Sequence, residues 1–278
     1  MGSRTKRILT RALLHATVAV VVGVLFFPVY WMFNTSLAPQ DQLYVYPPRM
    51  IHPSATLAAY VKIFSERPIA RWMANSFFVV VLTGVFALTI SVLAGYSLSR
   101  FRVRGSGSLG YLLLASRMLP TTLLVIPLFV FMSSLKLINT LWSVVIANVT
   151  FIMPFATWML KGYFDSIPRE LEEAAYIDGT SRLGALIKVT MPLAAPGVAA
   201  TTLYSAILAW DEYLFARTFL TTNSVWTISV GLGSFRGEYI TFWNEVMAAS
   251  LVGTLPIIVI FLLLEKQLVG GLTAGAVK

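Results

Sequence analysis

The sequence predicts an all-α integral membrane protein with six transmembrane helices and both termini in the cytoplasm. Of its 278 residues, 57% are hydrophobic and only 12% are charged, whereas a soluble domain carries about 25% charged residues. Apolar runs of about 20 residues, long enough to cross a bilayer, alternate along the chain with polar segments. This pattern indicates one membrane domain that covers residues 1–278, without a linker.

The sequence lacks the residues for disulfides and metal sites, and it lacks several common phosphate-binding and catalytic motifs. It has no cysteine, and its two histidines, His15 and His52, are far apart and have no ligand-spaced partner, so we expect no disulfide and no metal site. It also has no G-x-x-x-x-G-K-[ST] phosphate loop, no H-E-x-x-H and no G-x-S-x-G motif. We therefore expect that the chain is not an enzyme and holds no cofactor of its own.

The first apolar run covers residues 13–33 and follows four basic residues within 1–11. A signal peptide also begins with basic residues, but its apolar core is only about 7–15 residues long. The longer run here predicts the first spanning helix. The polar segment 35–74 comes next, and its amphipathic stretch 57–64 is expected to lie at the outer membrane surface.

Five further apolar runs predict five more spanning helices, near residues 75–98, 109–133, 141–160, 197–219 and 246–264. Prolines lie inside several of these later runs, at Pro120, Pro127, Pro154 and Pro256. Proline is tolerated in a membrane helix where neighbouring helices satisfy the carbonyl groups that it leaves free. The prolines therefore indicate a packed bundle around a cavity.

The distribution of basic residues predicts the orientation. Six spans place both termini on the same side of the membrane. The segments on that side carry 13 lysines and arginines, against 7 on the other side, and an excess of Lys and Arg marks the cytoplasm. The net charge of +9 is thus explained by cytoplasmic loops, and we expect no nucleic acid partner.

The loop 166–196, between the fourth and fifth runs, is the longest polar interruption in the second half of the chain. Ser166 can cap a helix whose first turn contains Pro168 and acidic residues that suit the positive end of the helix dipole. Gly179 can adopt the left-handed conformation that ends such a helix, and one of the two hydroxyl residues after it can cap the next. The loop is predicted to be two short helices joined by a tight turn.

The spacing within this loop resembles the EAA loop of permease subunits in binding-protein-dependent ABC importers. In that family Glu-Ala-Ala is followed at fixed intervals by Gly, an aliphatic residue and Leu-Pro. The matching residues here are Glu173-Ala174-Ala175, Gly179, Val189 and Met191-Pro192, with Met191 as the one departure. The resemblance implies a cytoplasmic coupling helix that docks on an ATPase subunit through Glu172, Glu173, Ala174, Ala175, Asp178, Gly179 and Pro192.

Phrases similar to the smaller permease subunit of maltose-type transporters run in order along nearly the whole chain. They include Asn75-Ser76, Arg117-Met118-Leu119-Pro120, Ala209-Trp210-Asp211-Glu212-Tyr213 and the tail 270–278. This resemblance to the carbohydrate-importer branch implies a permease subunit that moves a sugar or sugar derivative across the cytoplasmic (inner) membrane of a prokaryote.

The same resemblance implies a set of protein partners, in addition to the membrane lipid that surrounds the chain. They are a second homologous permease, two ATPase subunits that bind ATP and Mg, and an extracytoplasmic solute-binding protein or lipoprotein. It also implies that the tail, with Leu272, Thr273 and Gly275, reaches between the two ATPase subunits.

Two ionisable residues lie deep within the predicted spans. At about 1.5 Å per residue, Arg117 lies about 12 Å into the third span and Asp211 about 20 Å into the fifth, and such groups usually face a cavity or a partner. With Asn139, Trp210 and Glu212 they form a candidate substrate path, because sugar hydroxyls need polar and aromatic neighbours. A structural ion pair or a charge at a subunit interface explains them about equally well. Asp211 also stands where the family usually has Asn.

Two other functions are compatible with the sequence. An ABC importer permease for a non-sugar solute, such as an amino acid or a polyamine, would carry the same loop. A self-sufficient secondary transporter would usually show inverted repeats, and none is visible in the sequence.

Overall fold

The computed structural model describes residues 3–101, 105–235, 237 and 240–274, and every regular element within these ranges is helical. In this part of the chain, four helices are long and apolar enough to cross a membrane. Two bent pairs of helices meet the same criterion, which makes six spans if each pair is one broken span. The all-helical membrane architecture is therefore confirmed.

The chain divides into two compact units. The smaller unit comprises residues 1–69 and 234–253, and the larger comprises residues 70–233 and 254–278. The long helices α3 (Ile69–Arg100) and α13 (Trp243–Ala274) each have residues in both units.

The smaller unit contains α1 (Ser3–Ser36), α2 (Ala58–Glu66) and the first part of α13. The apolar stretch Thr10–Ser36 of α1 covers the first predicted span. Helix α2 is joined to α13 by Lys62, whose Nζ donates a hydrogen bond to Glu245 Oε1 at 2.6 Å. Of the amphipathic positions, Leu57, Val61 and Phe64 are exposed, as expected for a helix with one apolar surface.

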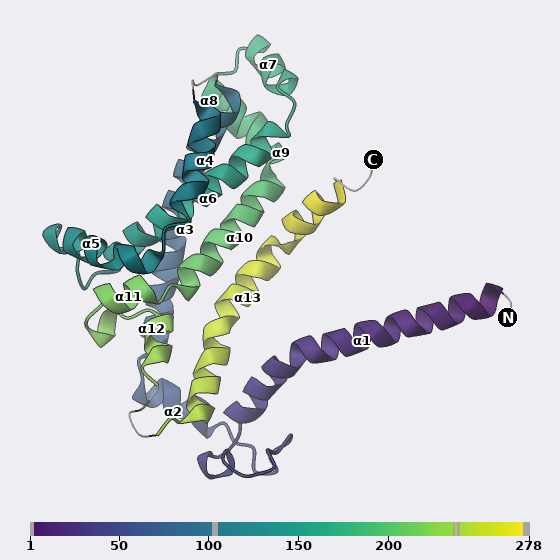
Figure 1. Ribbon diagram of the computed structural model, residues 1–278, viewed down its shortest axis with the longest axis vertical. Helices are drawn as coiled ribbons and strands as arrows, with labels where there is room; N and C mark the ends of the chain where they lie inside the picture. The colour runs from purple at the N-terminus through teal and green to yellow at the C-terminus, as the bar shows by residue number, and fades with distance from the viewer. Residues whose placement is uncertain (1–2, 102–104, 236, 238–239, 275–278) are drawn as a thin grey trace. The chain divides into compact units, whose positions relative to one another are not determined.

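The larger unit contains most of α3 and the second part of α13, together with α4 (Ser106–Ser116), α5 (Thr121–Ser134), α6 (Leu141–Asp165), α7 (Glu170–Ile177), α8 (Arg182–Ala185), α9 (Met191–Leu193), α10 (Ala195–Asp211), α11 (Leu214–Phe219) and α12 (Ile228–Gly233). Helix α6 packs along α10 (Figure 1). The two helices approach closely at Gly197, where an added Cβ would lie 2.2 Å from Cγ of Tyr163.

The third predicted span, 109–133, is not one straight helix. It is divided into α4 and α5, whose axes differ by 89°. Pro120, with φ −59° and ψ 124°, stands at the break as the residue before α5. A proline disfavours the helical conformation of the residue before it and has no N–H to donate, so the chain turns there.

The fifth predicted span, 197–219, is also interrupted. Helix α10 ends at Asp211, Glu212 is extended, and α11 begins at Leu214. The Glu212 carboxylate accepts hydrogen bonds from the backbone N–H groups of Phe215, at 2.6 Å, and Ala216, at 2.8 Å. A side chain that binds the first free N–H groups of a helix favours a helix start at that point, which explains why α10 does not continue.

Candidate functional site

The loop 166–196 forms the predicted pair of short helices, α7 and α8, followed by the π-helical turn Leu186–Thr190 and by α9. Gly179 has φ +81°, the left-handed conformation expected after α7. Ser181 Oγ accepts a hydrogen bond from the N–H of Gly184 at 3.2 Å and so caps α8. In Figure 1, α7 and α8 lie at one end of the larger unit.

One detail of the predicted loop is wrong. Ser166 does not cap α7, because α6 continues as far as Asp165 and Ser166 closes that helix instead. Its Oγ donates a hydrogen bond to the carbonyl of Tyr163 at 2.7 Å. Helix α7 begins later, at Glu170, after Arg169.

Glu172 is the buried centre of a hydrogen-bond network that joins three elements. Its relative exposure is 3%. Oε1 accepts hydrogen bonds from Arg100 Nε and from Thr190 Oγ1, each at 2.7 Å, and Oε2 accepts one from Tyr96 Oη at 2.8 Å. Tyr96 and Arg100 belong to α3, and Thr190 belongs to the π-helical turn, so one carboxylate holds α7 against both.

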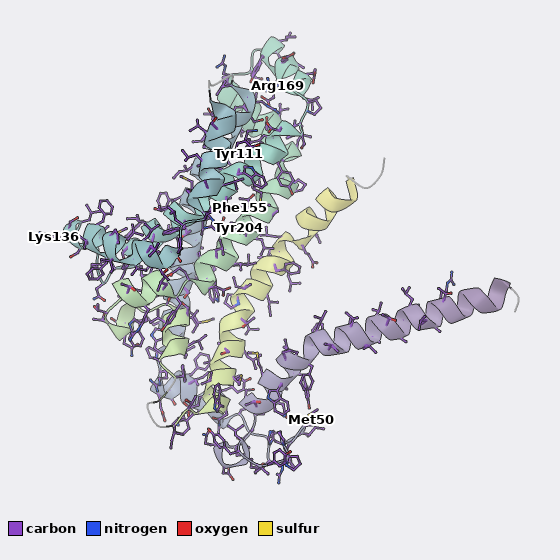
Figure 2. The ribbon with its side chains drawn as sticks, viewed as in Figure 1. Met50, Tyr111, Lys136, Phe155, Arg169 and Tyr204 are labelled. Carbon is purple, nitrogen blue, oxygen red and sulfur yellow. The ribbon has the colours of Figure 1, made fainter. Side chains whose placement is uncertain are left out.

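Two arginines strengthen the link between α3 and the start of α7. A second nitrogen of Arg100 donates to the carbonyl of Ile167 at 3.0 Å. Arg169, labelled near α7 in Figure 2, donates to the carbonyl of Ser99 at 2.8 Å. The end of α3 and the loop thus form one cross-linked structure.

The pKa of Glu172 reflects this network. Burial by itself raises the pKa of the carboxyl, but hydrogen bonds from Thr190, Arg100 and Tyr96 outweigh it and hold the pKa below its ordinary value of 4.5. The group is therefore a carboxylate at neutral pH, as suits the hydrogen bonds that it accepts from these three side chains.

The opposite side of α7 is exposed. Glu173 and Ile177 lie one helical turn apart, which places them on the same face, and Ile177 is 87% exposed. Leu183 of α8 and Ile187 of the π-helical turn are also large exposed apolar residues. Of the other residues proposed for coupling, Ala174, Asp178, Gly179 and Pro192 are exposed and Ala175 is half-buried.

The adjacent acidic residues Glu172 and Glu173 therefore have different environments, one buried in a network and one in solvent. The motif does not distinguish them, because it contains no information on which face of α7 packs. Arg100, Tyr96 and Thr190 were not among the predicted site residues. The sequence gives only a weak sign of two of them: Tyr96 and Arg100 are polar residues at the end of the apolar run 75–98.

Arg117 and Glu212, two of the candidate path residues, line the same cavity of about 230 Å³. Arg117 follows the last turn of α4 and donates hydrogen bonds to the carbonyl of Phe151 at 2.7 Å and to Tyr204 Oη at 2.8 Å. The ring of Tyr204 packs against that of Phe155, with centroids 4.7 Å apart, and Figure 2 labels these two residues side by side. Arg117 lies at the break before α5 and Glu212 at the break after α10, and both side chains line this one cavity.

The other three candidate path residues lie outside the lining of that cavity. Asn139, with φ +63°, accepts hydrogen bonds at its Oδ1 from the N–H groups of Thr221 and Thr222, each at 3.0 Å, and so fastens the loop after α5 to the loop after α11. Trp210 is 6% exposed. Asp211 is exposed at the end of α10.

The tail residues cannot be compared with the structure in the same way. Leu272 and Thr273 lie in the last turns of α13, but their side chains are outside the described part of the chain, and Gly275 lies beyond it.

Comparisons with known proteins agree with this architecture. The family model for the binding-protein-dependent transport system inner membrane component matches residues 87–269. The chain is 36% identical to the sulfoquinovosyl glycerol transport system permease protein SmoH of Agrobacterium fabrum, over 95% of this chain and 92% of that protein. It is 34% identical to the trehalose/maltose transport system permease protein MalG of Thermococcus litoralis, over 98% of this chain and 99% of that protein.

A solved structure has the same fold. It is the crystal structure of a bacterial ABC transporter involved in the import of the acidic polysaccharide alginate, one chain of which matches with a TM-score of 0.79 and 24% identity. The match covers 96% of this chain and 98% of that one. Together, the family match, the two relatives and the shared fold establish that this chain belongs to the family of binding-protein-dependent transport system inner membrane components.

Proposed function

We propose that the chain is a permease subunit through which an ABC importer moves a sugar or sugar derivative across the cytoplasmic membrane of a prokaryote. Two relatives of more than 30% identity over nearly the whole chain are named for the transport of sulfoquinovosyl glycerol and of trehalose and maltose. All three solutes contain sugar units, which favours a sugar over an amino acid or a polyamine as the solute of this chain.

In this proposal, partner subunits supply the energy for transport. Two ATPase subunits bind ATP and Mg, a second homologous permease completes the membrane part, and an extracytoplasmic solute-binding protein or lipoprotein delivers the solute. The sequence of the chain itself contains no phosphate-binding loop.

The exposed face of α7 is the element that docks on the ATPase. It combines a carboxylate, Glu173, with the apolar Ile177 one turn away, and both are exposed. Exposed apolar residues that adjoin a charged one are typical of surfaces that bind another protein. Glu172 anchors the same helix to α3, so a force applied to α7 is transmitted to a long apolar helix. This relationship is the observation that carries the proposal.

The docking of α7 on the ATPase also sets the orientation of the chain in the membrane. The loop 166–196 and both termini face the cytoplasm, where the ATPase subunits are. The tail with Leu272, Thr273 and Gly275 reaches between those subunits, so that removal of residues 272–278 lowers transport more than membrane insertion.

The direct experiment changes the charge of the docking face. In the reconstituted complex, Glu173→Lys should lower both transport and copurification of the ATPase subunits by at least about tenfold, because a like charge facing a basic ATPase residue weakens binding by about 1.4 kcal/mol or more. Glu66→Lys makes the same charge change on α2, at an exposed position of the smaller unit, and should leave ATPase retention unchanged.

The membrane level of each variant is measured in the same preparations. If Glu173→Lys retains the ATPase subunits normally and transports at the parental rate, α7 is not the coupling element.

A further inference from the structure

A second cavity of about 230 Å³ lies within the smaller unit, where α1 and the first part of α13 reach the membrane surface. The apolar stretch of α1 ends at Ser36 and that of α13 begins at Trp243. Tryptophan is enriched at the depth of the lipid headgroups, so the cavity lies in the headgroup layer. Apart from apolar neighbours, its lining consists of Trp31, Thr35, Gln42, Arg49, His52 and Trp243.

The segment between α1 and α2, which forms one side of this cavity, is fastened to both helices. Asn34 of α1 donates through Nδ2 to the carbonyl of Arg49 at 3.0 Å, and Figure 2 labels the adjacent Met50 beside the end of α1. Asn244 of α13 donates through Nδ2 to the carbonyl of Ala38 at 3.2 Å. The walls of the cavity are therefore held in place by hydrogen bonds to two long helices.

Arg49 places an accessible positive charge at the cavity. Its Nη1 donates to Gln42 Oε1 at 3.4 Å, and Gln42 Nε2 donates to Ser54 Oγ at 2.8 Å, so the guanidinium is oriented. A guanidinium has five N–H donors in one plane, and the structure shows no described acceptor for the others. The side chain is exposed, so a ligand can reach these donors.

The rest of the polar lining favours an anion over a sugar. The two tryptophans carry an indole N–H, which donates and does not accept. The carbonyl oxygen of Gln42 is already used by Arg49. No described residue of the lining is Asp or Glu. Sugar hydroxyls need acceptors as well as donors, whereas a phosphate needs donors and a positive charge.

We propose that this cavity binds the phosphate of an anionic glycerophospholipid. The guanidinium of Arg49 donates to two phosphate oxygens, as is common for Arg with phosphate, and basic pockets beside membrane helices suit anionic headgroups. The described lining offers no carboxylate to the ammonium group of a zwitterionic lipid, which favours phosphatidylglycerol over phosphatidylcholine.

The size of the cavity and the surface beside it suit a lipid. The volume of about 230 Å³ is below the range of about 300–1,000 Å³ for pockets that enclose drug-sized ligands, so the headgroup fits and the acyl chains stay outside. Next to Trp31 on α1 lies Phe27, whose ring centroid is 6.1 Å away and which is 47% exposed, so apolar surface is available to those chains. In the orientation of the proposed function, the lipid belongs to the outer leaflet.

The test measures lipid binding by the purified full chain in detergent, by native mass spectrometry with equal amounts of phosphatidylglycerol and phosphatidylcholine. The parental chain should bind phosphatidylglycerol in preference. Arg49→Gln should weaken that binding about tenfold, because the charge-assisted contacts are lost, and should leave phosphatidylcholine binding unchanged. The backbone carbonyl that Asn34 binds is kept in this variant, and its unfolding midpoint checks that the fold is intact.

Arg67 supplies a matched control in the same unit. Its guanidinium lies over the ring of Phe235, 5.2 Å from the centroid, and it does not line the cavity. Arg67→Gln removes the same charge and should leave the affinity for phosphatidylglycerol unchanged.

A second measurement locates the lipid without altering Arg49. Met247 lines the cavity from α13, and Met247→Cys introduces the only cysteine of this chain. A small uncharged thiol reagent should alkylate this cysteine more slowly in phosphatidylglycerol nanodiscs than in phosphatidylcholine nanodiscs. Ser224→Cys, exposed in the larger unit, should react at the same rate in both.

Three results would overturn the headgroup site. The first is equal affinity for phosphatidylglycerol in the parental chain and Arg49→Gln, or an equal loss in Arg67→Gln. The second is alkylation of Met247→Cys at the same rate in the two kinds of nanodisc. The third is displacement of the lipid by millimolar inorganic phosphate, which would make the cavity a site for a free anion. None of these measurements involves transport, so failure of the lipid site leaves the proposed function intact.

Discussion

Arg100 donates its Nε–H to Glu172 Oε1 at 2.7 Å, and the two side chains are 7% and 4% exposed. The bond joins the end of α3 to the helix that carries the exposed Glu173. A buried ion pair contributes little net stability when it is compared with an apolar pair, but the loss of one partner leaves an uncompensated charge. The pair therefore specifies where α7 lies more than it strengthens the fold.

The first prediction concerns removal of one member of this pair. Glu172→Ala should destabilise the chain by about 3–5 kcal/mol, because Arg100 would stay buried without its partner. Thermal unfolding of the purified protein in detergent measures the effect. The double variant Arg100→Met with Glu172→Leu should recover most of the loss, and Glu173→Ala should have no effect on the unfolding midpoint. A double variant less stable than Glu172→Ala would contradict this account.

The second prediction is the pH dependence of the same group. The pKa of Glu172 is lower in the folded chain than its ordinary value of 4.5, so the folded state favours the carboxylate. Its contribution is fully present above pH 4.5 and is lost as the pH falls from that value through the folded pKa. The difference in unfolding midpoint between the parental chain and Glu172→Gln should be constant from neutral pH down to that point and then shrink. If this difference in unfolding midpoint grows on acidification, the folded state favours the protonated carboxyl of Glu172, and the prediction is wrong.

The third prediction concerns the turn between α7 and α8. Gly179 has φ +81°, and no atom lies within 4 Å of the position of an added Cβ. Gly179→Ala should therefore cost only the conformational strain, about 1–2 kcal/mol. Transport should fall, because relief of that strain at the turn changes the angle of α7.

Gly105 is the matched control for this turn. It has φ +86° and the same open surroundings, so Gly105→Ala should lower the unfolding midpoint by a similar amount. Transport and ATPase retention should stay at the parental level in this variant. Equal transport loss in both variants would assign the effect to general destabilisation.

The fourth prediction is the orientation of the loop 166–196. The chain has no cysteine, so single cysteines report accessibility without background from this subunit. Ile177→Cys, expressed without the ATPase subunits, should resist an impermeant thiol reagent in intact cells and react after permeabilisation. Ser224→Cys, in the segment between α11 and α12, is exposed and should react in intact cells.

Labelling of Ile177→Cys but not Ser224→Cys in intact cells would reverse the assigned topology.

The sequence by itself determined the class of the protein and the local conformation of its central loop. Low charge and long apolar runs indicate a membrane protein because few chains of that composition remain soluble. The turn at Gly179 and the cap at Ser181 were predictable because each depends on a few neighbouring residues, and both are present. The fixed spacing from Glu173 to Pro192 was sufficient to indicate the family to which the chain belongs.

The tertiary structure decided which residues meet. Pro120 and Glu212 interrupt two runs that hydropathy alone treats as continuous, because apolar content does not depend on where a helix breaks. Arg117 and Glu212, one at each break, line the same cavity although they are far apart in the sequence. Likewise, the burial of Glu172 and the exposure of Glu173 depend on the face that α7 turns toward Tyr96 and Arg100. Long-range contacts of this kind are made by packing, and no local pattern in the sequence contains them.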